Sequence, residues 1–109
     1  MTDLYAYSFY SPLSMAEIFQ RLDALGTWRW IERDNDNWGE YISARALRDP
    51  HDGMVKLISD GGRYIINVYL RSDQPGAGAA FAAIRDTVFQ QVLPAIDASD
   101  ILKTNDIES

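Results

Sequence analysis

Residues 54–70 read MVKLISDGGRYIINVYL, and this stretch decides the fold because it has the pattern of a β-hairpin. Branched and aromatic residues alternate with polar ones on both sides of a glycine pair, which is typical of two antiparallel strands joined by a tight turn. With Asp60-Gly61 as a two-residue turn, Leu57 would pair with Tyr64. One face would then carry Val55, Leu57, Ser59, Gly62, Tyr64, Ile66, Val68 and Leu70.

The block from Trp28 to Ala46 has the same period of two and predicts another hairpin. Its strands meet around residues 35–37, which read Asn-Asp-Asn. A two-residue turn there would place Trp30 beside Tyr41 and split the apolar side chains between two faces. We therefore expect a three-residue turn. The buried face would then carry Trp28, Trp30, Ile42 and Ala44.

A helix is expected before this block, over Met15–Leu25. Ser14 and Glu17 have the spacing of a capping box, and Gly26 is a residue that commonly ends a helix. A β-favouring stretch from Leu4 to Tyr10 precedes the helix and predicts the first strand. The apolar stripe of the helix consists of Met15, Ile18, Phe19, Leu22 and Leu25.

A second helix is expected from about Gly78 to Leu93-Pro94. The order is then strand, helix, four strands and helix, with Ile101 and Leu102 forming either a short further strand or part of the surface. That order predicts an α+β fold of two layers, a mainly antiparallel sheet of about five strands with both helices on one face. We expect a ferredoxin-like arrangement or a relative of it.

Length and composition limit the classes of function. The chain has 109 residues, no cysteine and one histidine, His51. Disulfides, thiol nucleophiles and thiolate metal sites are therefore excluded, and His51 is expected to be an exposed turn residue rather than a catalytic base. We expect one α+β domain over residues 1–96, an acidic tail over residues 97–109, no cofactor and no metal. The chain shows no secretion signal and no spanning segment, so a cytoplasmic protein is expected.

The net charge of −6 and the isoelectric point near 4.5 bear on the choice of partner. An acidic protein repels phosphate backbones and anionic membrane surfaces over long range. We therefore expect neither nucleic acid nor a membrane as a partner, and a protein partner of basic character is favoured.

An acidic cluster lies at the expected hairpin around residues 35–37. With the three-residue turn, Glu32 would lie nearly opposite Glu40. Such a group could hold a hard cation or seat an arginine or lysine of a partner, and a solvated hairpin end is the other interpretation. The segment lacks the ordered loop of an EF-hand, which counts against the cation. The candidate partner-binding residues are Glu32, Asp34, Asp36, Trp38 and Glu40.

The outer face of the sheet, opposite the helices, is the second candidate surface. Tyrosine and arginine are enriched in protein interfaces, and both types are expected on this face. Tyr5 and Tyr7 would join it if the first strand has the matching parity. The face could form a homodimer, a ligand site between two sheets, a single-stranded RNA platform that the negative charge disfavours, or a hydrated surface. Its candidate residues are Arg29, Tyr41, Arg45, Arg63, Asn67 and Tyr69.

Two functions from different classes remain open. The first is a small acidic, non-catalytic protein-binding domain, of the kind that immunity or antitoxin-type inhibitors of nucleases represent by analogy. The second is a homodimeric α+β barrel that binds a small apolar molecule or acts on it as an oxygenase-like enzyme. The absence of an assembled catalytic set favours the first.

Overall fold

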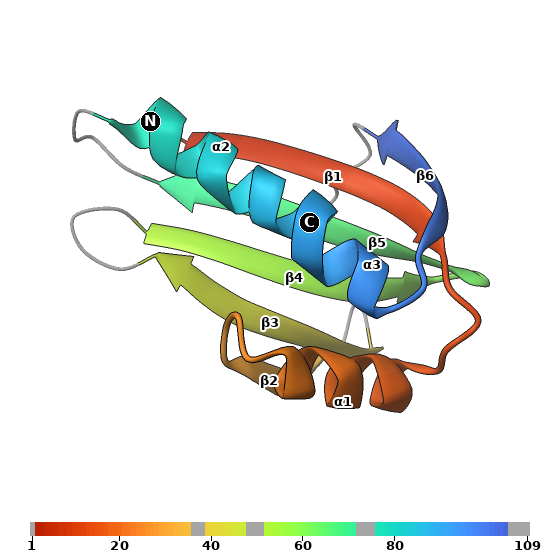
Figure 1. Cartoon of the computed structure of the whole chain (residues 1–109). Coiled ribbons are helices and arrows are strands. Elements are labelled where there is room, and N and C mark those ends of the chain that lie inside the picture. Colours follow the sequence, from red (N-terminus) through yellow and green to blue (C-terminus); the bar gives the residue numbers. More distant parts are fainter. Residues whose placement is uncertain (1, 36–38, 48–51, 72–75, 105–109) are drawn as a thin grey trace.

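The computed structural model describes residues 2–35, 39–47, 52–71 and 76–104, which form a two-layer α+β fold. One layer is an open antiparallel sheet, and the helices lie together on one of its faces (Figure 1). The strands are β1 (Thr2–Tyr10), β2 (Trp30–Asn35), β3 (Gly39–Leu47), β4 (Asp52–Asp60), β5 (Arg63–Arg71) and β6 (Ser99–Thr104).

The strand order is β2-β3-β4-β5-β1-β6, and every neighbouring pair is antiparallel. Strands β2 to β5 follow one another as a meander, whereas β1 pairs with β5 across a long stretch of sequence. The predicted α+β class is confirmed. The sheet has six strands rather than about five, because Ile101 and Leu102 belong to a strand, and the ferredoxin-like arrangement is not confirmed.

The β4–β5 hairpin turns at Gly61-Gly62 rather than at Asp60-Gly61. Asp60 pairs with Arg63, so the strands are still paired immediately before and after the two glycines. Both glycines have positive φ, +55° and +91°, as a two-residue turn of type I′ requires. The predicted register was therefore wrong by two residues. Because this shift is even, the expected side chains still face the helices, and Leu57 and Val55 are fully buried.

This turn predicts different responses at its two glycines. Gly62→Ala is expected to lower the free energy of unfolding by about 1–2 kcal/mol, because a side chain at φ +91° is strained. Gly61→Asn is expected to change it by less than about 0.5 kcal/mol, since asparagine tolerates the left-handed region and Asn-Gly suits this turn. Urea denaturation of both variants provides the measurement. Equal losses would contradict the observed turn.

The β2–β3 hairpin has the expected three-residue connection, placed one residue later than predicted. Asn35 still pairs with Gly39, so only residues 36–38 separate the paired strands. Trp30 pairs with Ala44, and both side chains are buried on the helix side together with Ile42. Trp28 precedes β2 and packs partly buried against this core.

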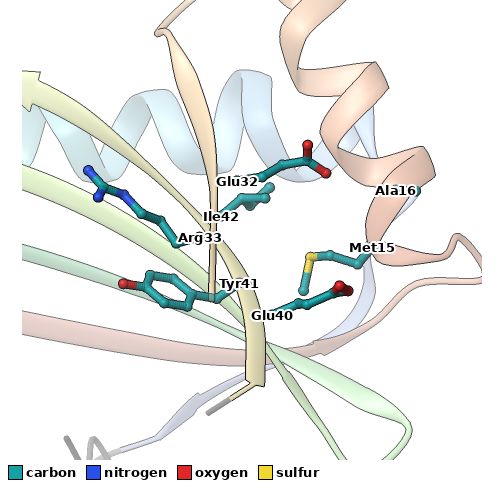
Figure 2. Close-up of a pocket in the computed structure, with 7 residues that line it drawn as sticks. All are labelled: Met15, Ala16, Glu32, Arg33, Glu40, Tyr41 and Ile42. Atoms are coloured by element: carbon teal, nitrogen blue, oxygen red, sulfur yellow. The ribbon is translucent and has the colours of Figure 1, made fainter. Parts of the chain in front are cut away.

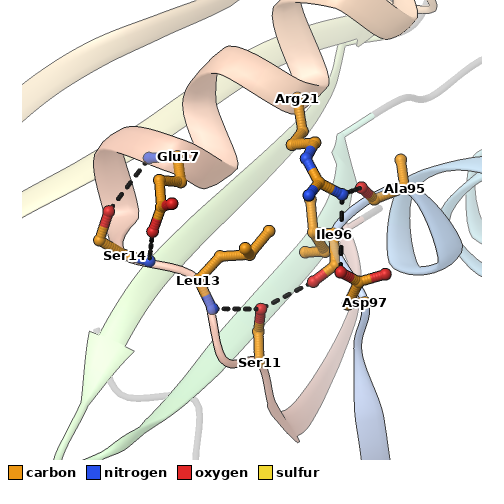
Figure 3. Close-up of polar contacts among 8 residues, drawn as sticks. All are labelled: Ser11, Leu13, Ser14, Glu17, Arg21, Ala95, Ile96 and Asp97. Carbon is orange, nitrogen blue, oxygen red and sulfur yellow. Dashed lines mark hydrogen bonds and ion pairs between the residues drawn. The ribbon is translucent and has the colours of Figure 1, made fainter.

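Helix α1 (Met15–Leu25) begins and ends where the sequence predicted. The Glu17 backbone N–H donates to Ser14 Oγ at 3.2 Å, and the Ser14 N–H donates to Glu17 Oε1 at 2.9 Å, which completes the capping box (Figure 3). The hydrogen bond from the Ser14 backbone N–H, with a smaller contribution from the Ser14 side chain, holds the pKa of the Glu17 carboxyl below its usual value. Gly26, at φ +76°, ends the helix. The buried residues of α1 are Ile18 and Leu22.

The second helix is one continuous rod of α2 (Ala77–Thr87), the π-helical turn η1 (Val88–Val92) and α3 (Leu93–Ala95). The helix ends at Ala95, one residue beyond the predicted end at Leu93-Pro94, because it continues through the proline. A proline in a regular α-helix clashes with the carbonyl four residues back. Here the turn before Pro94 is wider, with the Leu93 N–H bonded to the Val88 carbonyl. No described helix is long and apolar enough to cross a membrane.

Aromatic contacts join the helix layer to β1. The Tyr5 ring stacks on Phe81 with 4.9 Å between centroids, and Tyr7 meets Phe89 edge-on at 4.7 Å. Tyr5 and Tyr7 therefore face the helices, and β1 lacks the parity that would have placed them on the outer face. Figure 1 shows α1 at the β2 end of the sheet and the second helix along β5 and β1.

Two hydroxyl groups hold the connection between β1 and α1. Ser11 Oγ donates to the Ile96 carbonyl at 2.7 Å and accepts the Leu13 N–H at 3.2 Å (Figure 3). Tyr64 Oη donates to the Leu13 carbonyl at 2.6 Å. Burial raises the pKa of the Tyr64 phenol, and the negative charge of Glu17 raises it further. The connection is thus bound to both β5 and the end of the second helix.

Candidate functional site

A pocket of about 330 Å³ lies between the first turn of α1 and the β2–β3 hairpin. Figure 2 shows the carboxylates of Glu32 and Glu40 on the side of the strands that faces Met15, whereas Arg33 and Tyr41 extend to the other side. The lining residues are Met15, Ala16, Glu32, Arg33, Glu40, Tyr41 and Ile42.

The two glutamates share this pocket but are not direct cross-strand partners. Glu32 pairs with Ile42, and Glu40 pairs with Asp34. The expectation that Glu32 lies opposite Glu40 was wrong, because the hairpin connection comes one residue later than predicted. The two glutamates are diagonal neighbours on one face, and side chains in this relation remain within reach of a common ligand.

The chemistry of the pocket suits a basic side chain. Ile42 is only 1% exposed and Met15 is half-buried, so together they form an apolar surface beneath the two exposed carboxylates. Among the side chains that the structure describes, no ion pair engages Glu32 or Glu40. A lysine or arginine covers apolar surface with its stem while its charged end meets carboxylate oxygens.

Part of the predicted acidic cluster lies outside the described residues. Asp36 and Trp38 are in this group, and the side chain of Asp34 is not described. His51, the expected turn residue, also lies outside the described residues. Within the described ranges, no three His, Cys, Asp or Glu side chains come together as a metal site. Sequence reasoning placed Met15 in the helix core stripe and missed its place in the pocket, since only the packing of α1 beside β2 creates that proximity.

The outer face of the sheet is the second surface, and none of the described elements lies over it (Figure 1). The strand registers align its side chains in rows that run across the sheet. One row contains Arg33, Tyr41, Ile58, Ile65, Ser8 and Leu102. The middle row contains Ile31, Ser43, Lys56, Asn67 and Ala6. The third contains Arg45, Met54 and Tyr69.

Five of the six predicted outer-face residues lie in these rows or beside them, namely Tyr41, Arg45, Arg63, Asn67 and Tyr69. Arg29 is exposed and precedes β2, so it belongs to no paired row.

The side chain of Lys56 lies at the centre of this face. The Lys56 ammonium lies 5.9 Å from the centroid of the Tyr41 ring and 5.4 Å from that of Tyr69. Beside it, Ser43 is buried, and Asn67 Oδ1 is buried without a hydrogen-bond partner. The period-two alternation of the sequence places Lys56 on the same face as the two tyrosines, but the candidate residues predicted from the sequence did not include it.

Arg63 joins three strands at the other end of the face. Its Nε donates to Ser8 Oγ at 2.8 Å, and its Nη1 pairs with Asp100 Oδ2, also at 2.8 Å. Its Nη2 donates to the Asp100 carbonyl at 2.6 Å. These bonds attach β6 to β5 across β1, so Arg63 serves the fold.

Comparison with known proteins was made for the whole chain. No protein-family model matches it, and a search of the curated proteins finds no match. The functional argument therefore starts from the geometry of the two surfaces.

Proposed function

We propose that this protein is a non-catalytic protein-binding domain that seats a lysine or arginine of a basic partner in the pocket beside α1. The supporting observation is that Glu32 and Glu40 open onto the same pocket whose apolar part is Met15 and Ile42. The pocket matches both parts of a long basic side chain, the aliphatic stem and the cationic end.

Binding suits these carboxylates better than catalysis does. Both are exposed, whereas acid–base catalysis by a carboxylate pair relies on burial to give the two groups different proton affinities. The net charge of −6 also raises the rate at which a basic protein meets this surface. The partner in this proposal is a basic protein such as a nuclease, which the domain inhibits in the manner of an immunity or antitoxin-type protein.

The alternative of a sheet-to-sheet homodimer receives less support. Arg33, Arg45 and Lys56 lie on the outer face, so two copies placed face to face would bring like charges together. Tyr5 and Tyr7 face the helices, so their rings would not contribute contact area to such a dimer interface.

The test uses a fluorescein-labelled decalysine peptide and protein labelled with ¹³C at its methionine methyl groups. Met15 lines the pocket, while Met54 lies on the outer face and reports on that surface separately. We expect the Met15 resonance to shift on titration and the Met54 resonance to stay in place. A shift of Met54 alone would show that the basic peptide binds the outer face rather than the pocket, and it would overturn the proposal.

Matched variants separate the pocket from net charge. Glu32→Gln with Glu40→Gln is expected to weaken binding about tenfold, the size of a lost charge-assisted hydrogen bond. Asp23→Asn with Asp86→Asn alters the net charge equally at exposed helix positions, and less than a twofold change is expected. Ala16→Phe fills the pocket without altering charge and should also weaken binding. Equal losses in both double variants would show that net charge alone determines binding.

A further inference from the structure

Among the described side chains, the outer sheet face carries a charge opposite to that of the whole protein. The chain carries sixteen acidic and ten basic residues. Four of the basic side chains, Arg33, Arg45, Lys56 and Arg63, lie on this one face. Among the described side chains in its rows there is no carboxylate, and Asp100 at the β6 edge is already bound to Arg63. The described side chains of this face are thus basic on a protein of net charge −6.

The centre of the face is suited to a carboxylate. Lys56 is only half exposed, and its ammonium lies near both tyrosine rings, so its position is restrained before any partner arrives. Arg33 and Arg45 are exposed in the rows on either side of it. Ile31, Ile58 and Met54 add apolar area between these charges. Because the Lys56 side chain is already restrained, it loses less conformational entropy when a ligand binds.

We infer that the outer sheet face is a second docking surface, which binds an acidic segment of a partner protein. Carboxylates of the segment meet Arg33, Lys56 and Arg45, and its apolar side chains cover Ile31 and Met54. The acidic carboxylates lie on the helix side of the same hairpin, and Arg33 and Tyr41 border both surfaces.

The observations favour a protein segment over a nucleic acid. Platforms for single-stranded nucleic acid present open aromatic faces on which bases stack. Here Lys56 lies over both tyrosine rings. The rest of the protein is acidic, and it repels a polymer with a phosphate at every position more strongly than a peptide with a few carboxylates. A second copy is disfavoured because the same bases would face one another.

The test titrates the ¹³C-methionine protein with a labelled decaglutamate peptide and, in parallel, with a ten-nucleotide single-stranded RNA of mixed sequence. Decaglutamate is expected to shift the Met54 resonance and to leave that of Met15 in place. Arg33→Gln with Arg45→Gln is expected to weaken this binding at least fivefold. Arg21→Gln with Lys103→Gln removes equal charge from exposed positions away from the face, and less than a twofold change is expected.

Each other outcome overturns the inference. Tighter binding of the RNA, with the same shift of Met54, would assign the face to nucleic acid. A Met54 shift that grows with protein concentration before any probe is added would assign the face to a second copy. If both double variants bound decaglutamate equally weakly, or if Met54 did not shift, the face would not be a specific site for an acidic segment. None of these results would affect the pocket test, because that test is read at Met15.

Discussion

Phe9→Ala is expected to lower the free energy of unfolding by about 3–5 kcal/mol, the largest effect of any single change considered for this protein. Phe9 is fully buried on β1 and stacks on Tyr64 with 5.8 Å between ring centroids. Its strand lies between β5 and β6, so neighbouring backbone prevents collapse around the cavity. A domain of this size has a total stability of about 5–15 kcal/mol, so the variant would be close to unfolding.

Thermal and urea denaturation of Phe9→Ala measure this loss, and Phe89→Ala is the control of the same residue type. Phe89 is 39% exposed and contacts Tyr7 at the helix surface, so its removal is expected to cost roughly 1–2 kcal/mol. If the two variants lost equal stability, the placement of Phe9 in the main core would be contradicted.

The second large effect is expected at a polar residue, with Ser11→Ala costing about 1–3 kcal/mol. Ser11 is 6% exposed, and its hydroxyl joins the chain before α1 to the Ile96 carbonyl. Alanine leaves this carbonyl buried without a donor and removes the acceptor of the Leu13 N–H. A buried polar group without a partner loses its hydration and gains nothing in return.

Urea denaturation of Ser11→Ala provides the measurement, with Ser59→Ala as the control. Ser59 is exposed near the end of β4, so its replacement is expected to change the free energy of unfolding by less than about 0.5 kcal/mol. A loss at Ser11 as small as that at Ser59 would show that the bond to Ile96 contributes little.

Elements specified by neighbouring residues were predictable from the sequence. Ser14, Glu17 and Gly26 determine both ends of α1 within a few positions, and the prediction of this helix was correct. Period-two alternation likewise identified the strands and the faces of β2 to β5, because the side chain of every second residue points to the same side. The two-layer α+β class follows from these elements and their order.

The errors occurred where tertiary structure or backbone conformation decides. The hairpin register depends on which pair of residues takes positive φ, and Gly62 accepts this conformation more readily than Asp60. The helix continues through Pro94 because the π-turn widens before it and Leu93 and Ile96 are buried against the core. The pocket arises from the packing of α1 beside β2, and no spacing in the sequence encodes that contact.

The pairing of β1 with β5 determines when the sheet can be completed during synthesis. Hairpins β2–β3 and β4–β5 join neighbouring segments, whereas the bond between Ser8 and Arg63 spans 55 residues of sequence. As the chain leaves the ribosome, the apolar side of β1 has no strand partner until β5 has emerged. Closing that large loop costs more conformational entropy than forming either hairpin, so it is expected to be slower. We therefore expect the docking of β1, rather than hairpin formation, to set the rate of folding.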